Sequence, residues 1–118
     1  MAMCRGAGDG GDLRSSFYDG GNAVEFFVSG ELDHYSVRNI REQIDEILIL
    51  RRPQKVILNL GDVTFSDSAG LGLILGRYNR VREYGGELEL CDVTPGIMKI
   101  LHLSGTDRII KIREEAVR

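Results

Sequence analysis

The chain has 118 residues, of which 15 are Lys or Arg and 18 are Asp or Glu, so its formal net charge is −3. A chain of this length builds one hydrophobic core. Its acidic balance argues against a protein that binds nucleic acid through excess positive charge. The sequence has no apolar run long enough to span a membrane and no basic start followed by an apolar stretch. We therefore expect a cytoplasmic protein with no membrane or direct nucleic-acid partner.

The two cysteines, Cys4 and Cys91, are too few for a disulfide framework or a zinc site. Cys91 ends an apolar run and is expected in the core, and no metal or other cofactor is predicted. Residues 1–12 are rich in glycine and lack apolar periodicity, which predicts a disordered N-terminal tail. Residues 13–118 are predicted to form a single domain.

In the first half of this domain, the apolar pattern predicts a hairpin, a helix and a buried strand. Strands are expected over 13–18 and 23–29, joined by a tight turn at 19–22. Ser36 is a suitable N-cap for the helix, and Arg51-Arg52-Pro53 ends it. The apolar stripe of this helix is Val37, Ile40, Ile44, Ile47 and Leu48. Residues 55–60 are nearly all apolar, which is typical of a strand covered on both faces.

The second half alternates helices and strands. A loop over 61–65 precedes a helix that opens at 66–68 and closes at Gly85-Gly86. Its expected apolar stripe is Leu71, Ile74, Leu75, Tyr78 and Val81, and Arg77, Arg80 and Arg82 are expected on a solvated face. A strand is expected over 87–91, a third helix after Thr94-Pro95, and a last strand over 109–112. This alternation predicts an α/β fold whose sheet is mixed because of the hairpin.

The segment over 65–72, Phe-Ser-Asp-Ser-Ala-Gly-Leu-Gly, places two hydroxyls and a carboxylate at a predicted helix N-terminus. One interpretation is capping, because Ser and Asp are preferred N-cap residues. Three candidates in a row exceed that need, however, and Gly70 and Gly72 are poor helix formers. Their missing side chains would let the backbone of another protein approach. A helix N-terminus also accommodates a phosphate.

Several motifs together resemble the anti-sigma factor antagonists, which are small proteins of the STAS-domain family. They are Gly-Glu-Leu-Asp-His at 30–34, Asp-Ser-Ala-Gly-Leu-Gly at 67–72, Leu-Gly-Arg-Tyr at 75–78, Gly85-Gly86 and Ser104-Gly105. Their order and spacing match that family from about residue 13 to 113. The resemblance implies a single STAS domain, a mixed β-sheet packed with α-helices. The first and third motifs are more similar to members that act in sporulation than to general-stress antagonists.

The resemblance also implies a phosphorylation site. Ser68 is similar to the serine that the cognate anti-sigma factor, itself a serine kinase, phosphorylates. Ala69 stands where the family often has a second Ser or Thr, which favours Ser68, although Ser66 remains a candidate. The implied partner-binding residues are Asp33, His34, Asp67, Ser68, Ala69, Gly70, Leu71 and Gly72. The family's terminal helix is missing, since 114–118 is too short for one, and an exposed apolar patch or a clipped chain is expected.

The implied mechanism is partner switching. The unphosphorylated chain binds the anti-sigma factor kinase and releases the sigma factor. Phosphorylation adds about −1.5 to −2 charges. The carboxylates of Asp67, Asp33 and Glu31 are expected near by, and the like charges, desolvated together in the interface, prevent binding. A phosphoserine phosphatase would reverse the switch. The chain is expected to be a monomer when free and not an enzyme.

Three alternatives remain open from the residues. A general-stress or stressosome-type regulator would keep the fold and change the circuit. A receiver-like domain would use Asp62 as phosphoacceptor, with Glu31 and Asp33 holding Mg²⁺. A small serine hydrolase would use Ser68 as nucleophile with His102 and either Asp92 or Asp107.

Overall fold

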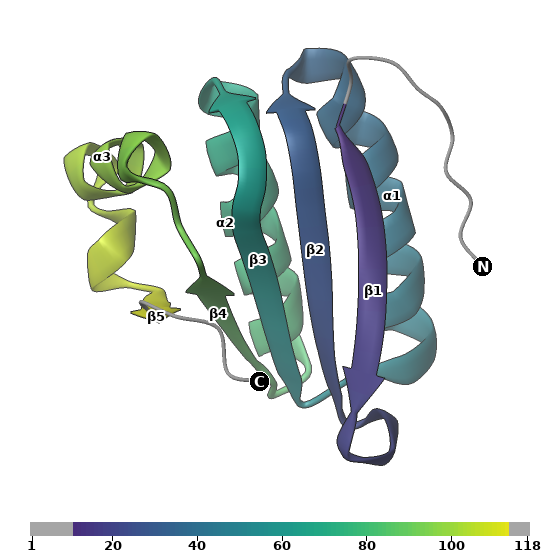
Figure 1. The fold of residues 1–118 in the computed structure, drawn as a ribbon. Coiled ribbons are helices and arrows are strands. Elements are labelled where there is room, and N and C mark those ends of the chain that lie inside the picture. Colours follow the sequence, from purple (N-terminus) through teal and green to yellow (C-terminus); the bar gives the residue numbers. More distant parts are fainter. Residues whose placement is uncertain (1–10, 114–118) are drawn as a thin grey trace.

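Five strands lie side by side in the order β1-β2-β3-β4-β5 (Figure 1). The structure is a computed structural model that describes residues 11–113. The strands are β1 (Asp12–Tyr18), β2 (Ala23–Leu32), β3 (Lys55–Ser66), β4 (Glu87–Cys91) and β5 (Lys111–Arg113). The helices are α1 (His34–Arg51), α2 (Ser68–Glu83) and α3 (Pro95–Ser104). Two single 3-10 turns are η1 (Asp19–Gly21) and η2 (Thr106–Arg108). The predictions for 1–10 and 114–118 lie outside the described residues.

The sheet is mixed, as predicted. β1 runs antiparallel to β2, and the turn between them holds Gly20 and Gly21 at positive φ, a conformation that glycine adopts without strain. The other neighbouring pairs are parallel, so each needs a crossover, which α1, α2 and α3 supply in turn. The carboxyl ends of β2 and β3 therefore lie at the same edge of the sheet.

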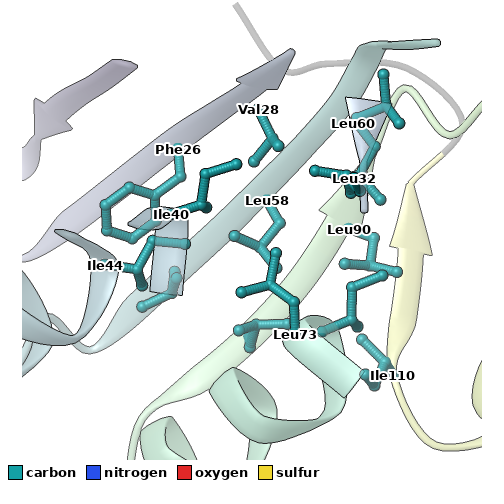
Figure 2. Packing of buried hydrophobic residues seen from close by; sticks show 14 of the residues in the cluster. Phe26, Val28, Leu32, Ile40, Ile44, Leu58, Leu60, Leu73, Leu90 and Ile110 are labelled. Carbon is teal, nitrogen blue, oxygen red and sulfur yellow. The ribbon is translucent and has the colours of Figure 1, made fainter. Parts of the chain in front are cut away.

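One face of the sheet forms the core against the helices. Alternate residues of each strand point into it, and α1 and α2 cover them from behind the sheet in Figure 1. Figure 2 shows this packing, in which Phe26 meets Ile40 and Ile44 of α1, while Leu73 of α2 lies with Leu58 and Leu90. α3 adds Ile97 and Leu101 to the same cluster. Cys91 is fully buried, as expected.

The opposite face of the sheet mixes polar residues, among them Glu25, Asn59 and Glu89, with apolar ones such as Ile57. Glu89 of β4 is only 3% exposed and forms ion pairs with Lys55 of β3, with Nζ and Oε2 3.3 Å apart, and with Arg113 of β5. Burial on its own would raise the pKa of Glu89, but the hydrogen bonds and charges of Lys55 and Arg113 outweigh it and hold the pKa below its usual range. The side chains of Glu89, Lys55 and Arg113 therefore link β3, β4 and β5.

Several element boundaries differ from the prediction. β3 continues through the predicted loop to Ser66, because two register shifts let it keep pairing with β2 up to the Leu32–Ser66 pair. β2 correspondingly extends to Leu32. The last strand begins at Lys111 rather than Ile109, since η2 holds 106–108 in a helical turn.

The solvated face predicted for α2 is also wrong in part. Arg77 is buried, with its Nε 2.9 Å from Asp45 Oδ1 of α1, and Arg80 contacts the same oxygen at 3.4 Å. Asp45 thus joins two helices instead of pairing with Arg41 along its own helix. The core face of α2 is formed by Gly70, Leu73, Ile74, Arg77 and Val81, whereas Leu71, Leu75 and Tyr78 are partly buried beside it.

Candidate functional site

Two helix N-termini lie side by side at the carboxyl edge of β2 and β3. Leu32 ends β2 opposite Ser66, which ends β3, and the backbone N–H of Asp67 donates to the carbonyl of Leu32 at 3.4 Å. α1 and α2 begin within two residues of these positions. The two segments that the sequence singled out, 30–34 and 66–72, are therefore brought together.

Asp33 caps α1, in place of the predicted Ser36. Its Oδ1 accepts hydrogen bonds from the backbone N–H groups of Tyr35 at 3.0 Å and Ser36 at 2.9 Å. Ser36 Oγ accepts in return from the N–H of Asp33 at 3.1 Å, which completes a capping box. The hydrogen bond from the Ser36 backbone is the largest contribution that lowers the pKa of Asp33. Asp33 is therefore a fixed anion at the site.

Asp67 caps α2, and Ser68 is the first residue of that helix. Asp67 Oδ1 accepts from the backbone N–H of Ala69 at 2.8 Å. Ser68 is exposed, and its side chain makes no hydrogen bond to any residue that the structure describes. The capping interpretation thus accounts for Asp67 and leaves the Ser68 hydroxyl available.

Ser66 and Gly70 face inward, unlike Ser68. Ser66 Oγ donates to the carbonyl of Asp67 at 3.1 Å. A Cβ built on the buried Gly70 would lie 2.0 Å from Ser66 Oγ and 3.3 Å from Leu32 Cβ. The missing side chain of Gly70 therefore makes room for Ser66. Gly72, in contrast, is exposed with no neighbouring atom within 4 Å of such a Cβ, and it is open to approach from outside.

A groove of about 430 Å³ runs between α1 and α2 beside these N-termini. α1 lines it with His34, Arg38 and Arg41, and α2 contributes Ala69, Gly72, Gly76 and Arg77 among others. Three of the sequence-predicted site residues, His34, Ala69 and Gly72, thus share one concave surface. Leu71 is partly buried against the core and does not line the groove.

Two exposed aromatic residues at this edge were not predicted. Tyr35 is 85% exposed and Phe65 is 54% exposed. Tyr35 follows the Asp33 cap and lies off the apolar stripe of α1, and Phe65 precedes Ser66. An aromatic residue that fits no apolar periodicity beside a cap is the signal that could have identified them. Large exposed aromatic side chains are common anchors of protein interfaces.

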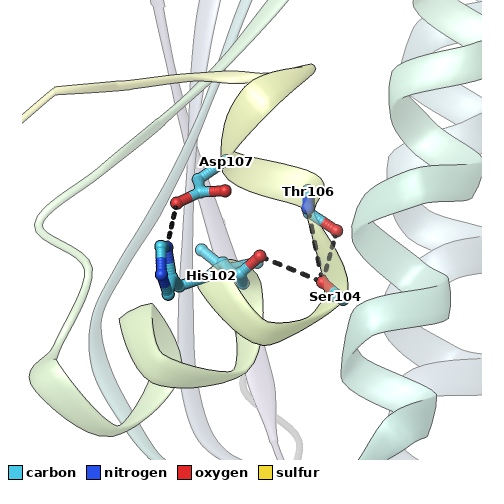
Figure 3. Close-up of polar contacts among 5 residues, drawn as sticks. His102, Ser104, Thr106 and Asp107 are labelled. Carbon is cyan, nitrogen blue, oxygen red and sulfur yellow. Dashed lines mark hydrogen bonds and ion pairs between the residues drawn. The ribbon is translucent and has the colours of Figure 1, made fainter.

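The geometry does not assemble the alternative hydrolase site. His102 Nδ1 lies 3.0 Å from Asp107 Oδ2, a contact between α3 and η2 that is drawn in Figure 3. Ser68, however, makes no hydrogen bond to His102 within the described residues, and a nucleophile needs such a contact with its base. The contact between His102 and Asp107 is therefore a link at the end of α3.

The positions of Asp62 and Asp33 also do not fit the receiver-like alternative. Asp62 lies within β3, paired in register with Ser29, rather than in a loop after the strand. Asp33 is occupied as a helix cap. In residues 11–113 no group of three or more His, Cys, Asp or Glu side chains is arranged to hold a metal ion.

Comparison with known proteins identifies the family. The model of the STAS domain matches residues 18–116. A curated relative, the anti-sigma F factor antagonist of Paenibacillus polymyxa, is 41% identical over 90 residues, which cover 76% of this chain and 77% of the relative. The chain belongs to the anti-sigma factor antagonists of the STAS-domain family. This antagonist is also 29% identical over 91 residues to the anti-sigma-B factor antagonist of Bacillus subtilis, covering 77% of this chain and 82% of that protein.

Solved structures agree with the fold of this antagonist. The anti-sigma factor antagonist SpoIIAA in its unphosphorylated form has a TM-score of 0.76 and 27% identity, covering 88% of this chain and 90% of that chain. Its phosphorylated form from Bacillus has a TM-score of 0.70 at the same identity, covering 88% of this chain and 93% of that chain.

None of the helices in residues 11–113 is long and apolar enough to cross a membrane.

Proposed function

We propose that this antagonist binds an anti-sigma factor serine kinase through the edge that carries Ser68, and that phosphorylation of Ser68 ends this binding. The supporting observation is that Ser68 is exposed and its hydroxyl makes no hydrogen bond within the described residues, whereas Ser66 is partly buried and donates to the carbonyl of Asp67. In the unphosphorylated state the kinase releases its sigma factor in favour of this chain.

The electrostatic surroundings of Ser68 support a switch that needs no refolding. Asp67 directly precedes Ser68, the fixed anion Asp33 caps the neighbouring helix at the same edge, and Glu31 is exposed there. A phosphoryl group adds about −1.5 to −2 charges to this acidic rim. In a close-fitting interface these charges would be desolvated together, which costs several kcal/mol. The helix N-terminus meanwhile stabilises the added charge within the free chain.

The relatives support the partners and the regulatory circuit that we propose for this chain. The anti-sigma F factor antagonist among them supports a sporulation circuit, and the anti-sigma-B factor antagonists support a general-stress circuit as the second candidate. The sporulation circuit is favoured because its relative is more similar, at 41% against 29% identity. We place the chain in the cytoplasm as a monomer when free, with a phosphoserine phosphatase that restores it.

Phosphate mapping tests the site. The full chain is incubated with ATP and the anti-sigma factor kinase of the same organism, and the modified residue is located by mass spectrometry. We expect one phosphate on Ser68 and none in the Ser68→Ala variant. Phosphate on Ser66 or another residue would overturn the site, and a chain that neither binds the kinase nor is phosphorylated would overturn the function.

A Ser68→Asp variant separates binding from folding. We expect it to bind the kinase at least 100-fold more weakly than the wild type. Its free energy of unfolding should stay equal or rise by about 0.3–1 kcal/mol, because a negative charge at a helix N-terminus is favourable. The control is Asn79→Asp, which adds the same charge at an exposed position later in α2. Kinase binding by Ser68→Asp at wild-type affinity would contradict the proposal.

A further inference from the structure

The groove between α1 and α2 adjoins Ser68. Ala69 and Gly72, which line it, follow Ser68 by one and four residues. Residues four apart lie on the same face of a helix, so Ser68 stands at the end of the groove. A molecule bound along the groove would therefore extend to the Ser68 hydroxyl.

The groove is basic, although the chain as a whole is acidic. Its charged lining consists of Arg38, Arg41 and Arg77, without a carboxylate, and His34 adds an imidazole ring. Arg38 and Arg41 are exposed and form no ion pair within the described residues. Arg77 shares Asp45 with Arg80, so that carboxylate is already engaged by two cations. The groove thus presents unneutralised positive charge.

The electrostatics of Arg77 point the same way. Burial lowers the pKa of Arg77 and Asp45 partly offsets this, but the neighbouring charges of Arg80 and Arg41 lower it further. The guanidinium groups of Arg80 and Arg41 therefore repel that of Arg77. An anionic group that enters the groove would relieve this repulsion.

The floor of the groove admits a polypeptide. Added Cβ atoms at Gly72 and Gly76 would meet no other atom within 4 Å. The absence of side chains at these two positions keeps space over one face of α2. A partner's backbone can approach there while its acidic side chains reach the arginines of α1.

We propose that this groove binds an acidic segment of the anti-sigma factor kinase and so orients the kinase over Ser68. The inference rests on the proposed function. A protein segment fits better than a nucleic acid, because Glu31, Asp33 and Asp67 form an acidic rim next to the groove that repels an extended polyanion. The partner must present negative charge to the groove and neutral or positive charge to the rim.

Charge reversal tests the proposal. The Arg38→Glu, Arg41→Glu double variant changes the net charge by four, and both side chains are exposed, so the fold should persist. Its control is Lys99→Glu, Arg108→Glu, an equal change at exposed positions on α3 and η2, on the other side of α2 from α1 (Figure 1). The dissociation constant for the kinase is measured by calorimetry at low and high salt, with urea unfolding as the check on folding.

We expect the Arg38, Arg41 variant to bind at least tenfold more weakly at low salt and to lose most of the wild type's salt dependence. The control should stay within twofold of the wild type at each salt concentration. If the double variant fails to fold, Arg38→Gln, Arg41→Gln replaces it, with the same direction expected.

Several results would overturn the inference. Wild-type affinity and salt dependence in the double variant, while Ser68 is still phosphorylated, would remove the groove assignment and leave the proposed function intact. A groove that binds a single-stranded DNA oligonucleotide more tightly than the kinase would replace the proposed occupant. Absence of any kinase binding by the wild type would remove both the function and this inference.

Discussion

At the scale of single residues, the site depends on which of three consecutive polar side chains is left free. Asp67 is consumed by capping and Ser66 by its contact with the next turn, so Ser68 remains. The absence of a side chain at Gly70 permits this arrangement, because a methyl group there would collide with Ser66 Oγ. The residue types at 66–70 therefore form one steric unit.

Replacing Gly70 and Gly72 by alanine should have opposite effects on stability. Both substitutions gain up to about 1 kcal/mol of helix propensity. Only Gly70→Ala forces Ser66 and Leu32 to move, an overpacking that costs about 1–3 kcal/mol. We expect Gly70→Ala to be less stable than Gly72→Ala by about 1–3 kcal/mol in urea unfolding. Equal stability of the two variants would show that Ser66 yields without cost.

At the scale of elements, ion pairs connect elements in addition to the apolar core. Glu89 connects β3, β4 and β5 on the face of the sheet opposite the core, and Asp45 connects α1 to α2. β5 has only three residues, so its attachment depends on Arg113 as well as on backbone pairing. This part of the molecule should respond to pH.

The Glu89→Gln variant should lower the free energy of unfolding by about 1–2 kcal/mol at pH 7, because it leaves Arg113 and Lys55 without their carboxylate. The folded-state pKa of Glu89 lies below its usual value. Its stabilising contribution is therefore complete above about pH 4.5 and is lost as the pH falls through the folded-state pKa.

Urea unfolding at pH 7 and pH 3 measures this contribution. The difference between the wild type and Glu89→Gln should shrink at pH 3. Glu87→Gln, at the exposed first residue of the same strand, should change stability by less than about 0.5 kcal/mol at either pH. A Glu89→Gln effect that is the same at both pH values would exclude ionisation as its cause.

The sequence predicted the elements better than their ends. Apolar periodicity located the helices and strands, because each buries one face in a common core. It missed the second half of β3, since Gly61 and Asp62 resemble a turn and only pairing with β2 keeps them extended. It placed the α1 cap at Ser36 because the capping box makes Ser36 and Asp33 reciprocal partners.

The site was predicted only as far as local sequence reaches. Asp67 and Ser68 were singled out by the local pattern at 65–72 and Asp33 by the family resemblance, and their roles in binding stay predictions. The buried position of Arg77 and the groove between α1 and α2 depend on two helices meeting, which no local pattern contains. A charged residue in the middle of an apolar stripe could have indicated a partner on the neighbouring helix.

At the scale of the whole molecule, the sheet has one apolar and one mixed face, and stability is distributed unevenly across it. β3 is paired on both sides, and its residues Val56, Leu58 and Leu60 are almost completely buried. β1 and β5 are the edges of the sheet. Segments with fewer buried contacts and fewer paired neighbours open at lower free energy.

Native-state hydrogen exchange should rank the strands accordingly. We expect the amides over 56–60 to exchange at rates set by global unfolding, and those of β5 to exchange faster by at least tenfold. The Glu89→Gln variant should accelerate β5 more than β3, since it removes the link to Arg113. Protection of the β5 amides equal to that of β3 would mean that the edge unfolds only with the whole domain.

The single free hydroxyl of the 66–68 segment limits how much information one molecule can carry. If Ser68 is the one acceptor, as proposed, each copy is either modified or unmodified, and no copy stores an intermediate level. A graded response would then come from the fraction of copies modified in the population. The packing at the helix start favours this binary behaviour, because Ser66 Oγ is bonded to the carbonyl of Asp67 in the space that Gly70 leaves. Under the proposed function, the balance of kinase and phosphatase would set that fraction.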